Sequence, residues 1–204
     1  LNIYNAENDN FSTLNLINRN NQENSGYIVN ILETADKSIW IGTTQGFFVV
    51  RDQGKSVQHF FLDSVNSGNS NTIFKIFEDR NQNIWIGTRN GLFRMENNRF
   101  NRFFLDEKKE RNTNHFIIRD IDTDHEGNFW ISTENDGVYV TRIQDDSLKI
   151  QFRLTKENGL LPSNTVRRLF IENEENIWIG TFEGLALFNA TDQSSRNISN
   201  SETS

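Results

Sequence analysis

Several short turns of this sequence carry side chains of the kinds that bind sugars and other polar ligands. Amides, cations, a carboxylate and an aromatic ring occur in them, and such groups orient a ligand in a site. The candidate ligand-binding residues are Arg89, Asn90, His115, Glu134, Asn135 and Phe182. The alternative interpretation is that they are ordinary turn residues. The irregular turn that begins at Glu134 and the neighbouring His115 are the strongest candidates.

Catalytic and metal chemistry have weaker support. The histidines His59, His115 and His125 fall in different parts of the repeat described below, so they form no general acid–base arrangement. The alternating carboxylates that begin at Asp122 and Asp124 would make a weak calcium site, and a solvated turn is the stronger interpretation. The chain has no cysteine, so it has no thiolate chemistry. We predict no catalytic residues, no metal site and no cofactor.

The candidate residues belong to a repeat built around tryptophan. Its central motif, Ile-Trp-Ile-Gly-Thr, occurs at residues 39–43, 84–88 and 177–181, with the variant Phe-Trp-Ile-Ser-Thr at 129–133. An apolar segment and a polar turn precede each motif, and a glycine and a further apolar segment follow it. The four tryptophans of the chain are 45, 45 and 48 residues apart; they are Trp40, Trp85, Trp130 and Trp178. A fixed period of this length indicates a repeat architecture.

Four strands in about 45 residues have the size of one β-propeller blade. The first segment of each copy is apolar at successive positions, which suits an inner strand covered on both faces. Each tryptophan can bury on the order of 200 Å², worth roughly 5 kcal/mol at about 25 cal/mol per Å², so we expect a core role rather than sugar stacking. An isolated blade cannot cover its own faces. We therefore predict an all-β fold, a partial β-propeller of about four four-stranded antiparallel blades.

The blades are predicted to occupy residues 1–188, followed by a polar, flexible tail at 189–204. Segments 1–4 and 11–17 resemble the last two strands of a blade that lacks its first two, and no fourth strand is obvious after Phe188. The leading segment could complete the last blade and close a four-bladed ring. We expect an open arc instead, whose apolar end faces favour self-association or a homodimer.

Three arginines fall in the inner segments, beside the expected axis: Arg119, Arg167 and Arg168. Two interpretations stay open. The arginines line the channel and meet an acidic group of a ligand, or they pair with Asp120 or Asp122.

The composition argues against two classes of binding partner. A net charge of −7 argues against nucleic acid and anionic membrane surfaces as partners. No apolar run approaches the roughly 20 residues of a membrane helix. The chain begins at Leu1 without a signal peptide, and we expect a fragment of a longer protein.

The repeat resembles the two-component regulator propeller repeat over residues 25–188. The best local match is Glu-Gly-Asn-Phe-Trp-Ile-Ser-Thr at 126–133, and Asn-Gly-Leu-Leu-Pro-Ser-Asn at 158–164 resembles the connector between blades. Two departures are Ser132 in place of glycine and Asp136 as an extra residue in the following turn. The resemblance implies the periplasmic sensor propeller of a hybrid two-component histidine kinase anchored in the inner membrane, which binds oligosaccharides or another small ligand.

Two alternative functions stay open. The first is a protein-interaction scaffold, a role that many propellers have. The second is a glycan-active enzyme, because residues 124–127 faintly resemble an Asp-box, although the glycine comes one residue too late. We expect the sensor and not an enzyme.

Overall fold

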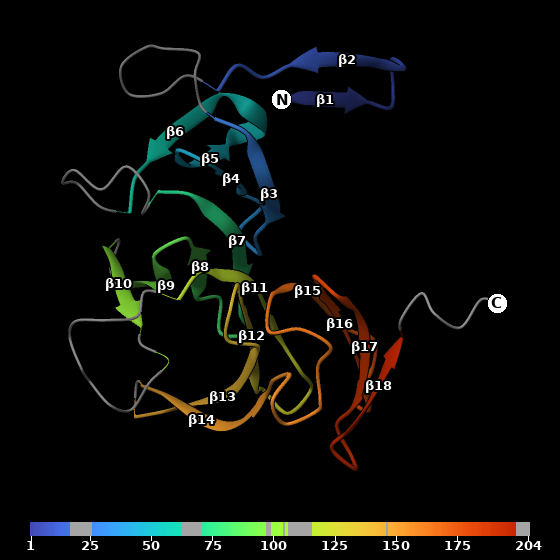
Figure 1. Ribbon diagram of the computed structural model, residues 1–204. Helices are drawn as coiled ribbons and strands as arrows, with labels where there is room; N and C mark the ends of the chain where they lie inside the picture. The colour runs from blue at the N-terminus through green and yellow to red at the C-terminus, as the bar shows by residue number, and fades with distance from the viewer. Residues whose placement is uncertain are drawn as a thin grey trace.

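The computed structural model describes residues 1–16, 26–62, 71–96, 99–103, 105, 116–145 and 147–198. Four sheets of four antiparallel strands stand side by side in an open arc, and a two-stranded hairpin precedes them (Figure 1). The prediction of a partial array of propeller blades is confirmed.

Each blade is an antiparallel sheet whose strands follow one another in sequence order. The hairpin comprises β1 (Asn2–Asn5) and β2 (Asn10–Thr13). Blade 1 comprises β3 (Ile28–Glu33), β4 (Ile39–Thr43), β5 (Gly46–Arg51), the 3-10 turn η1 (Asp52–Gly54) and β6 (Ser56–Phe60). Blade 2 comprises β7 (Ile73–Glu78), β8 (Ile84–Thr88), β9 (Gly91–Glu96) and β10 (Arg99–Phe103). Blade 3 comprises β11 (Ile118–Thr123), β12 (Phe129–Thr133), β13 (Val138–Gln144) and β14 (Ser147–Leu154). Blade 4 comprises β15 (Val166–Ile171), β16 (Asn176–Thr181), β17 (Gly184–Asn189) and β18 (Ser194–Ile198).

The blades meet along their inner strands and bury the tryptophans between them. The inner strands β3, β7, β11 and β15 contact one another in turn. Trp85 is fully buried, and Trp130 packs with Leu169 and Phe188 of the next blade. The tryptophans of blades 1 to 3 are core residues, as expected. Trp178, in the last blade, is only partly buried.

In blades 2, 3 and 4 the indole N–H also ties the tryptophan strand to the turn before it. Trp85 Nε1 donates to Asp79 Oδ2 at 2.8 Å, and Trp130 Nε1 donates to Asp124 Oδ2 at 2.9 Å. Asp79 is itself buried and accepts further bonds from the turn backbone. The carboxylate therefore satisfies a buried donor that would otherwise lose its water without compensation.

The boundary at residue 188 and the flexible tail are wrong for the described part of the segment. β17 continues to Asn189, and β18 pairs with it in register from Ser194 to Ile198. An outermost strand needs backbone partners on one side only, so its side chains can be polar and exposed. Because β18 covers the edge of β17, the leading hairpin does not complete blade 4, and the arc is open, as expected (Figure 1).

Candidate functional site

The inner strand of every blade has an irregularity at the same position. In blade 3, Ile118 pairs with Thr133 and Asp120 with Ser132, which leaves Arg119 out of register. The same shift occurs in the other three inner strands, so the displaced residues are Val29, Phe74, Arg119 and Arg167. A bulge of this kind redirects one side chain and is common beside binding sites.

The turn between the second and third strands lies against the start of the inner strand. In blades 2, 3 and 4 its first residue donates its backbone N–H to the residue just before that strand. The bonds run from Arg89 to Thr72 at 3.1 Å, from Glu134 to Ile117 at 3.0 Å and from Phe182 to Thr165 at 2.9 Å. Three of the predicted site residues therefore occupy equivalent positions, next to the bulges.

Blades 2, 3 and 4 contribute to one cluster of side chains, which we call the Glu134 cluster: Phe74, Arg119, Glu134 and Arg167. Glu134 Oε2 accepts from Arg119 Nε and from Arg167 Nη1, the latter at 2.9 Å. The guanidinium of Arg119 lies 4.0 Å from the centroid of the Phe74 ring. Glu134 is 19% exposed and Arg167 43% exposed, so the cluster has a largely buried inner part and an accessible outer part.

The pairing of Arg119 and Arg167 with Asp120 or Asp122 is wrong, because their carboxylate partner is Glu134. Asp120 instead binds Lys75 Nζ at 2.8 Å and accepts the backbone N–H of Leu169 at 3.0 Å. Asp120 therefore joins blade 3 to Lys75 of blade 2 and to Leu169 of blade 4.

The extra residue Asp136 has a structural role. Its carboxylate binds Arg153 and accepts from the Tyr139 hydroxyl, and its backbone N–H donates to Thr133 Oγ1 at 2.9 Å. These bonds fix the longer turn that carries Glu134. The sequence marked this turn as irregular but did not indicate what stabilises it.

Four of the remaining predicted site residues lie on the turns between the second and third strands of blades 2, 3 and 4. Asn135 is exposed beside Glu134, and Arg89 is exposed on the equivalent turn of blade 2. The carbonyl of Asn90 accepts from Arg102, and Phe182 is 73% exposed on blade 4. His115 lies outside the described residues. Phe74 was missed because it reads as one more apolar residue of an inner strand.

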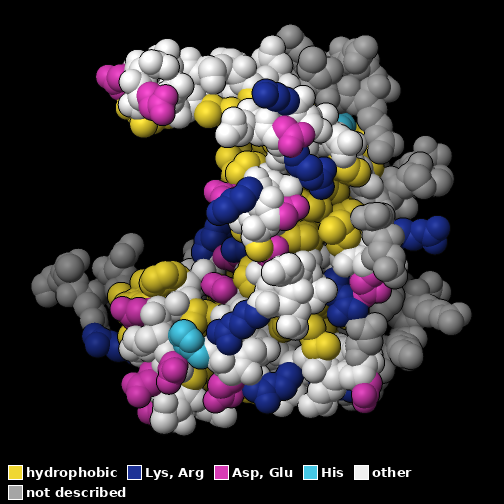
Figure 2. Space-filling model, turned by 180° about the vertical axis from the view of Figure 1, so that it is seen from behind, with side chains coloured by type: hydrophobic (Ala, Val, Ile, Leu, Met, Phe, Trp, Pro, Cys, Tyr) yellow, Lys and Arg dark blue, Asp and Glu magenta, His cyan; other side chains and the backbone are white. Residues whose placement is uncertain are grey.

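Charged groups also line the inner edge of the arc (Figure 2). Arg168 is exposed, and its Nη1 donates to the carbonyls of Arg119 and Arg167 at 3.4 and 3.2 Å. Burial raises the pKa of Asp122; the nearby Asp120 carboxylate raises it further and Lys75 lowers it. The inner edge is therefore polar, unlike the apolar faces between blades.

The described residues contain no group of three metal-binding side chains. Asp124 is engaged by Trp130 and by Asn128, whose backbone N–H donates to it at 2.8 Å, so it has a structural role in its turn. His59 is buried and stacks on Phe48 with ring centroids 4.3 Å apart. These contacts stabilise single blades.

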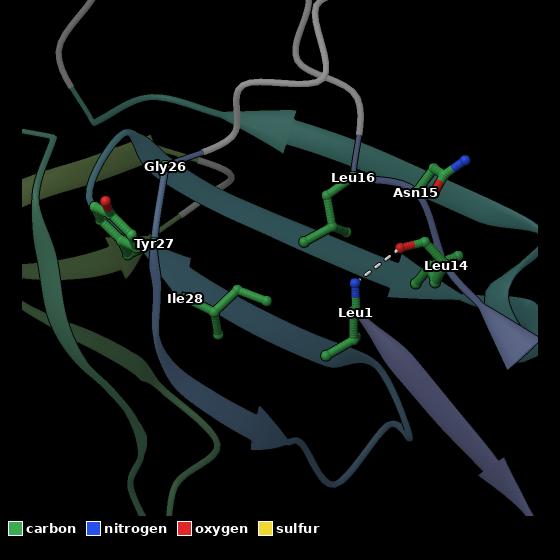
Figure 3. A pocket seen from close by; sticks show the side chains of 7 residues that line it. All are labelled: Leu1, Leu14, Asn15, Leu16, Gly26, Tyr27 and Ile28. Carbon is green, nitrogen blue, oxygen red and sulfur yellow. Dashed lines mark hydrogen bonds between the residues drawn. The ribbon is translucent and has the colours of Figure 1, made fainter. Parts of the chain in front are cut away.

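A hollow of about 410 Å³ lies between the segment that follows the hairpin and the first blade. Figure 3 shows Leu1, Leu16 and Ile28 around it, with the terminal amine of Leu1 donating to Leu14 O at 3.1 Å. Among its lining side chains only those of Asn15 and Tyr27 carry polar atoms, and none is charged, whereas the Glu134 cluster brings several charged groups together. The Glu134 cluster is therefore the better candidate for a site.

The described residues include no helix with the length and apolar character that a bilayer crossing requires. The sequence profile of the two-component regulator propeller family matches residues 22–45 and 67–90. These two segments are similar to two-component regulator propeller repeats. The matched segments are the first two inner strands with the tryptophan strands that follow them, and the same pattern recurs in blades 3 and 4. A search of curated proteins gave no match.

Solved structures show the same fold. The extracellular domain of the hybrid two-component system BT4673 from B. thetaiotaomicron is 20% identical with a TM-score of 0.71, over 85% of this chain and 25% of that one. The corresponding domain of BT3049 is 18% identical with a TM-score of 0.69, over 86% and 25%. A catalytically inactive virginiamycin B lyase from Staphylococcus aureus is 12% identical with a TM-score of 0.70, over 97% and 62%. The chain thus spans about a quarter of the length of the two extracellular domains, and the fold itself also occurs in an enzyme.

Proposed function

We propose that this chain is part of the periplasmic sensor region of a hybrid two-component signalling protein and that it recognises an oligosaccharide. The observation that carries the proposal is the Glu134 cluster, in which three bulged inner strands and one turn bring an aromatic ring, two cations and a carboxylate together. The repeat family and the likeness to extracellular domains of two-component systems support the signalling context. The proposed role is binding and not catalysis.

Binding of an array of neutral and acidic oligosaccharides to the 204-residue chain tests this proposal. We expect at least one saccharide class to bind, and we expect Phe74→Ala and Arg119→Gln to weaken that binding. Arg196→Gln is the matched control, because Arg196 is exposed on the outer strand β18. An array on which no saccharide binds, with the protein folded by circular dichroism, would contradict the proposal.

The end faces of the arc support a second proposal, that copies of this chain associate head to tail. A Cβ placed on Gly42 or Gly87 would lie 2.8 Å from Ile73 or Ile118, the first inner-strand residue of the next blade. A Cβ on Gly180 would meet only its own blade, at 3.8 Å or more, within the described part of the chain. The exposed Ile28 occupies the equivalent inner-strand position in blade 1. Leu1, Leu14 and Leu16 pack on the outer part of blade 1, so its inner part, with the exposed Ile28, is the surface proposed to receive blade 4 of another copy.

A further inference from the structure

Resting on the proposed function, we propose that the Glu134 cluster binds the carboxylate of an acidic saccharide, and that Glu134 occupies the place of that group in the free protein. The bound ligand would be a uronic acid or a related sugar acid. Glu134 shows that a carboxylate fits between the two guanidinium groups, because one of its oxygens accepts from both.

The cations are held in place before any ligand arrives. Arg119 is 21% exposed, stacks over Phe74, and donates to Glu134. Arg167 lies further out at 43% exposed, so one face of the pair is accessible. An arginine that is already oriented loses little conformational freedom on binding, and its planar fork matches a carboxylate.

Positive charge exceeds negative charge at this point of an otherwise acidic protein. In the Glu134 cluster, Arg119 and Arg167 carry two positive charges and Glu134 one negative charge, and the neighbouring Arg168 adds a third positive charge. Next to them, Lys75 is paired with Asp120, and Asp122 adds a further carboxylate. These seven groups sum to +1, whereas the whole chain has a net charge of −7. A local positive field favours an anionic ligand over a neutral one.

Because of the bulges, the two arginines leave the regular strand register and lie in the Glu134 cluster. At the same position, blades 1 and 2 carry Val29 and Phe74, and blades 3 and 4 carry Arg119 and Arg167. The fold does not require an arginine at this position, since the first two blades form without one. In this proposal, ligand binding rather than folding accounts for the two arginines and for the turn that carries Glu134.

Calorimetric titration with trigalacturonic acid and with its methyl ester tests the inference. The two saccharides differ chiefly in charge, so we expect the acid to bind at least tenfold more tightly than the ester. Arg167→Gln should weaken binding of the acid by about 10- to 100-fold, the range of a lost charged hydrogen bond. Arg196→Gln, which makes the same charge change on β18, should leave it unchanged.

The variant Glu134→Gln tests whether Glu134 occupies the place of the ligand carboxylate or has only a structural role. Removing the competing negative charge should tighten binding of the acid and leave the ester unaffected, whereas a structural role alone predicts weaker binding of both. Equal affinity for acid and ester overturns the inference but leaves saccharide sensing intact. Failure of every saccharide on the array, neutral or acidic, overturns sensing as well. Circular dichroism and the unfolding temperature of each variant confirm that the protein compared is folded.

Discussion

Gly87 lies where two blades come closest, and replacing it with alanine tests how the array is held together. The added Cβ would stand 2.8 Å from Ile118 Cγ2 and 3.3 Å from both the Cβ and the backbone oxygen of Ile118. Ile118 is fully buried in the next inner strand, so it cannot turn away into solvent. Overpacking of this kind costs about 1–3 kcal/mol.

The matched control is Gly180→Ala in blade 4. The new Cβ there has its nearest neighbours at 3.8 and 3.9 Å, both in Arg168. Neither glycine has a positive φ, so the backbone accepts alanine at both positions. Alanine also reduces the freedom of the unfolded chain, which stabilises by about 0.4–1 kcal/mol in each variant. We therefore expect Gly87→Ala to destabilise by about 1.5 kcal/mol and Gly180→Ala to stabilise by about 0.5 kcal/mol.

The unfolding temperature, followed by tryptophan fluorescence at low protein concentration, gives the measurement. A difference of about 2 kcal/mol in a chain of this size corresponds to roughly 4–8 °C between the two variants. Ile118→Ala removes the Cγ2 that the new Cβ would meet, so Gly87→Ala combined with Ile118→Ala should cost less than the sum of the two single losses. Equal shifts for the two alanine variants would refute the idea that the glycines exist to let blades approach.

Three further predictions concern the turn carboxylates and the end faces. Asp79→Ala should destabilise the chain by about 3 kcal/mol in urea unfolding, because it strands the buried Trp85 N–H and the turn donors. Glu172→Ala, whose bond to an indole is exposed, should cost much less, and equal losses would contradict this account. Asp122→Asn should raise the free energy of unfolding at pH 7, because burial raises the pKa of that carboxyl and makes its ionisation costly in the folded state. The gain should shrink as the pH falls through the folded pKa toward the unfolded value of 3.8, and a pH-independent gain would contradict this explanation. In sedimentation velocity the chain should associate with rising concentration, and Ile31→Glu on the exposed face of blade 1 should weaken the association; a wild-type chain that stays monomeric would exclude it.

The blades were predictable because their signals are local and repeated. A tryptophan every 45 to 48 residues, with a turn before it and a glycine after it, fixes three strands of each blade without knowledge of the partners. β18 was not predictable by the same means. Its residues are polar and exposed, and what holds it is main-chain pairing with β17, which leaves no trace in the hydrophobic pattern.

The site was predictable in part, for a related reason. The irregular turn at Glu134 is visible as one extra residue, and the cations of the inner strands stand out against apolar neighbours. The interpretation that paired them with Asp120 or Asp122 was wrong because it relied on nearness in sequence, whereas the bulge directs Arg119 toward the turn that carries Glu134. A bulge depends on strand register, and register is a property of the folded sheet.

The bulges suggest how one repeat serves different ligands without a change of fold. The residues that build each blade, such as the buried Trp85 and the close-packed Gly87, are constrained by contact with the next blade. The residue type at the bulge of each inner strand is not fixed by the sheet, because Val29 and Arg119 have equivalent positions and unlike chemistry. Each blade contributes one such residue, so the chemistry of the proposed site can change in one blade without a change in the others. The tryptophans and glycines still supply the stacking energy between blades. Under the proposed function, a change of ligand therefore need not cost stability.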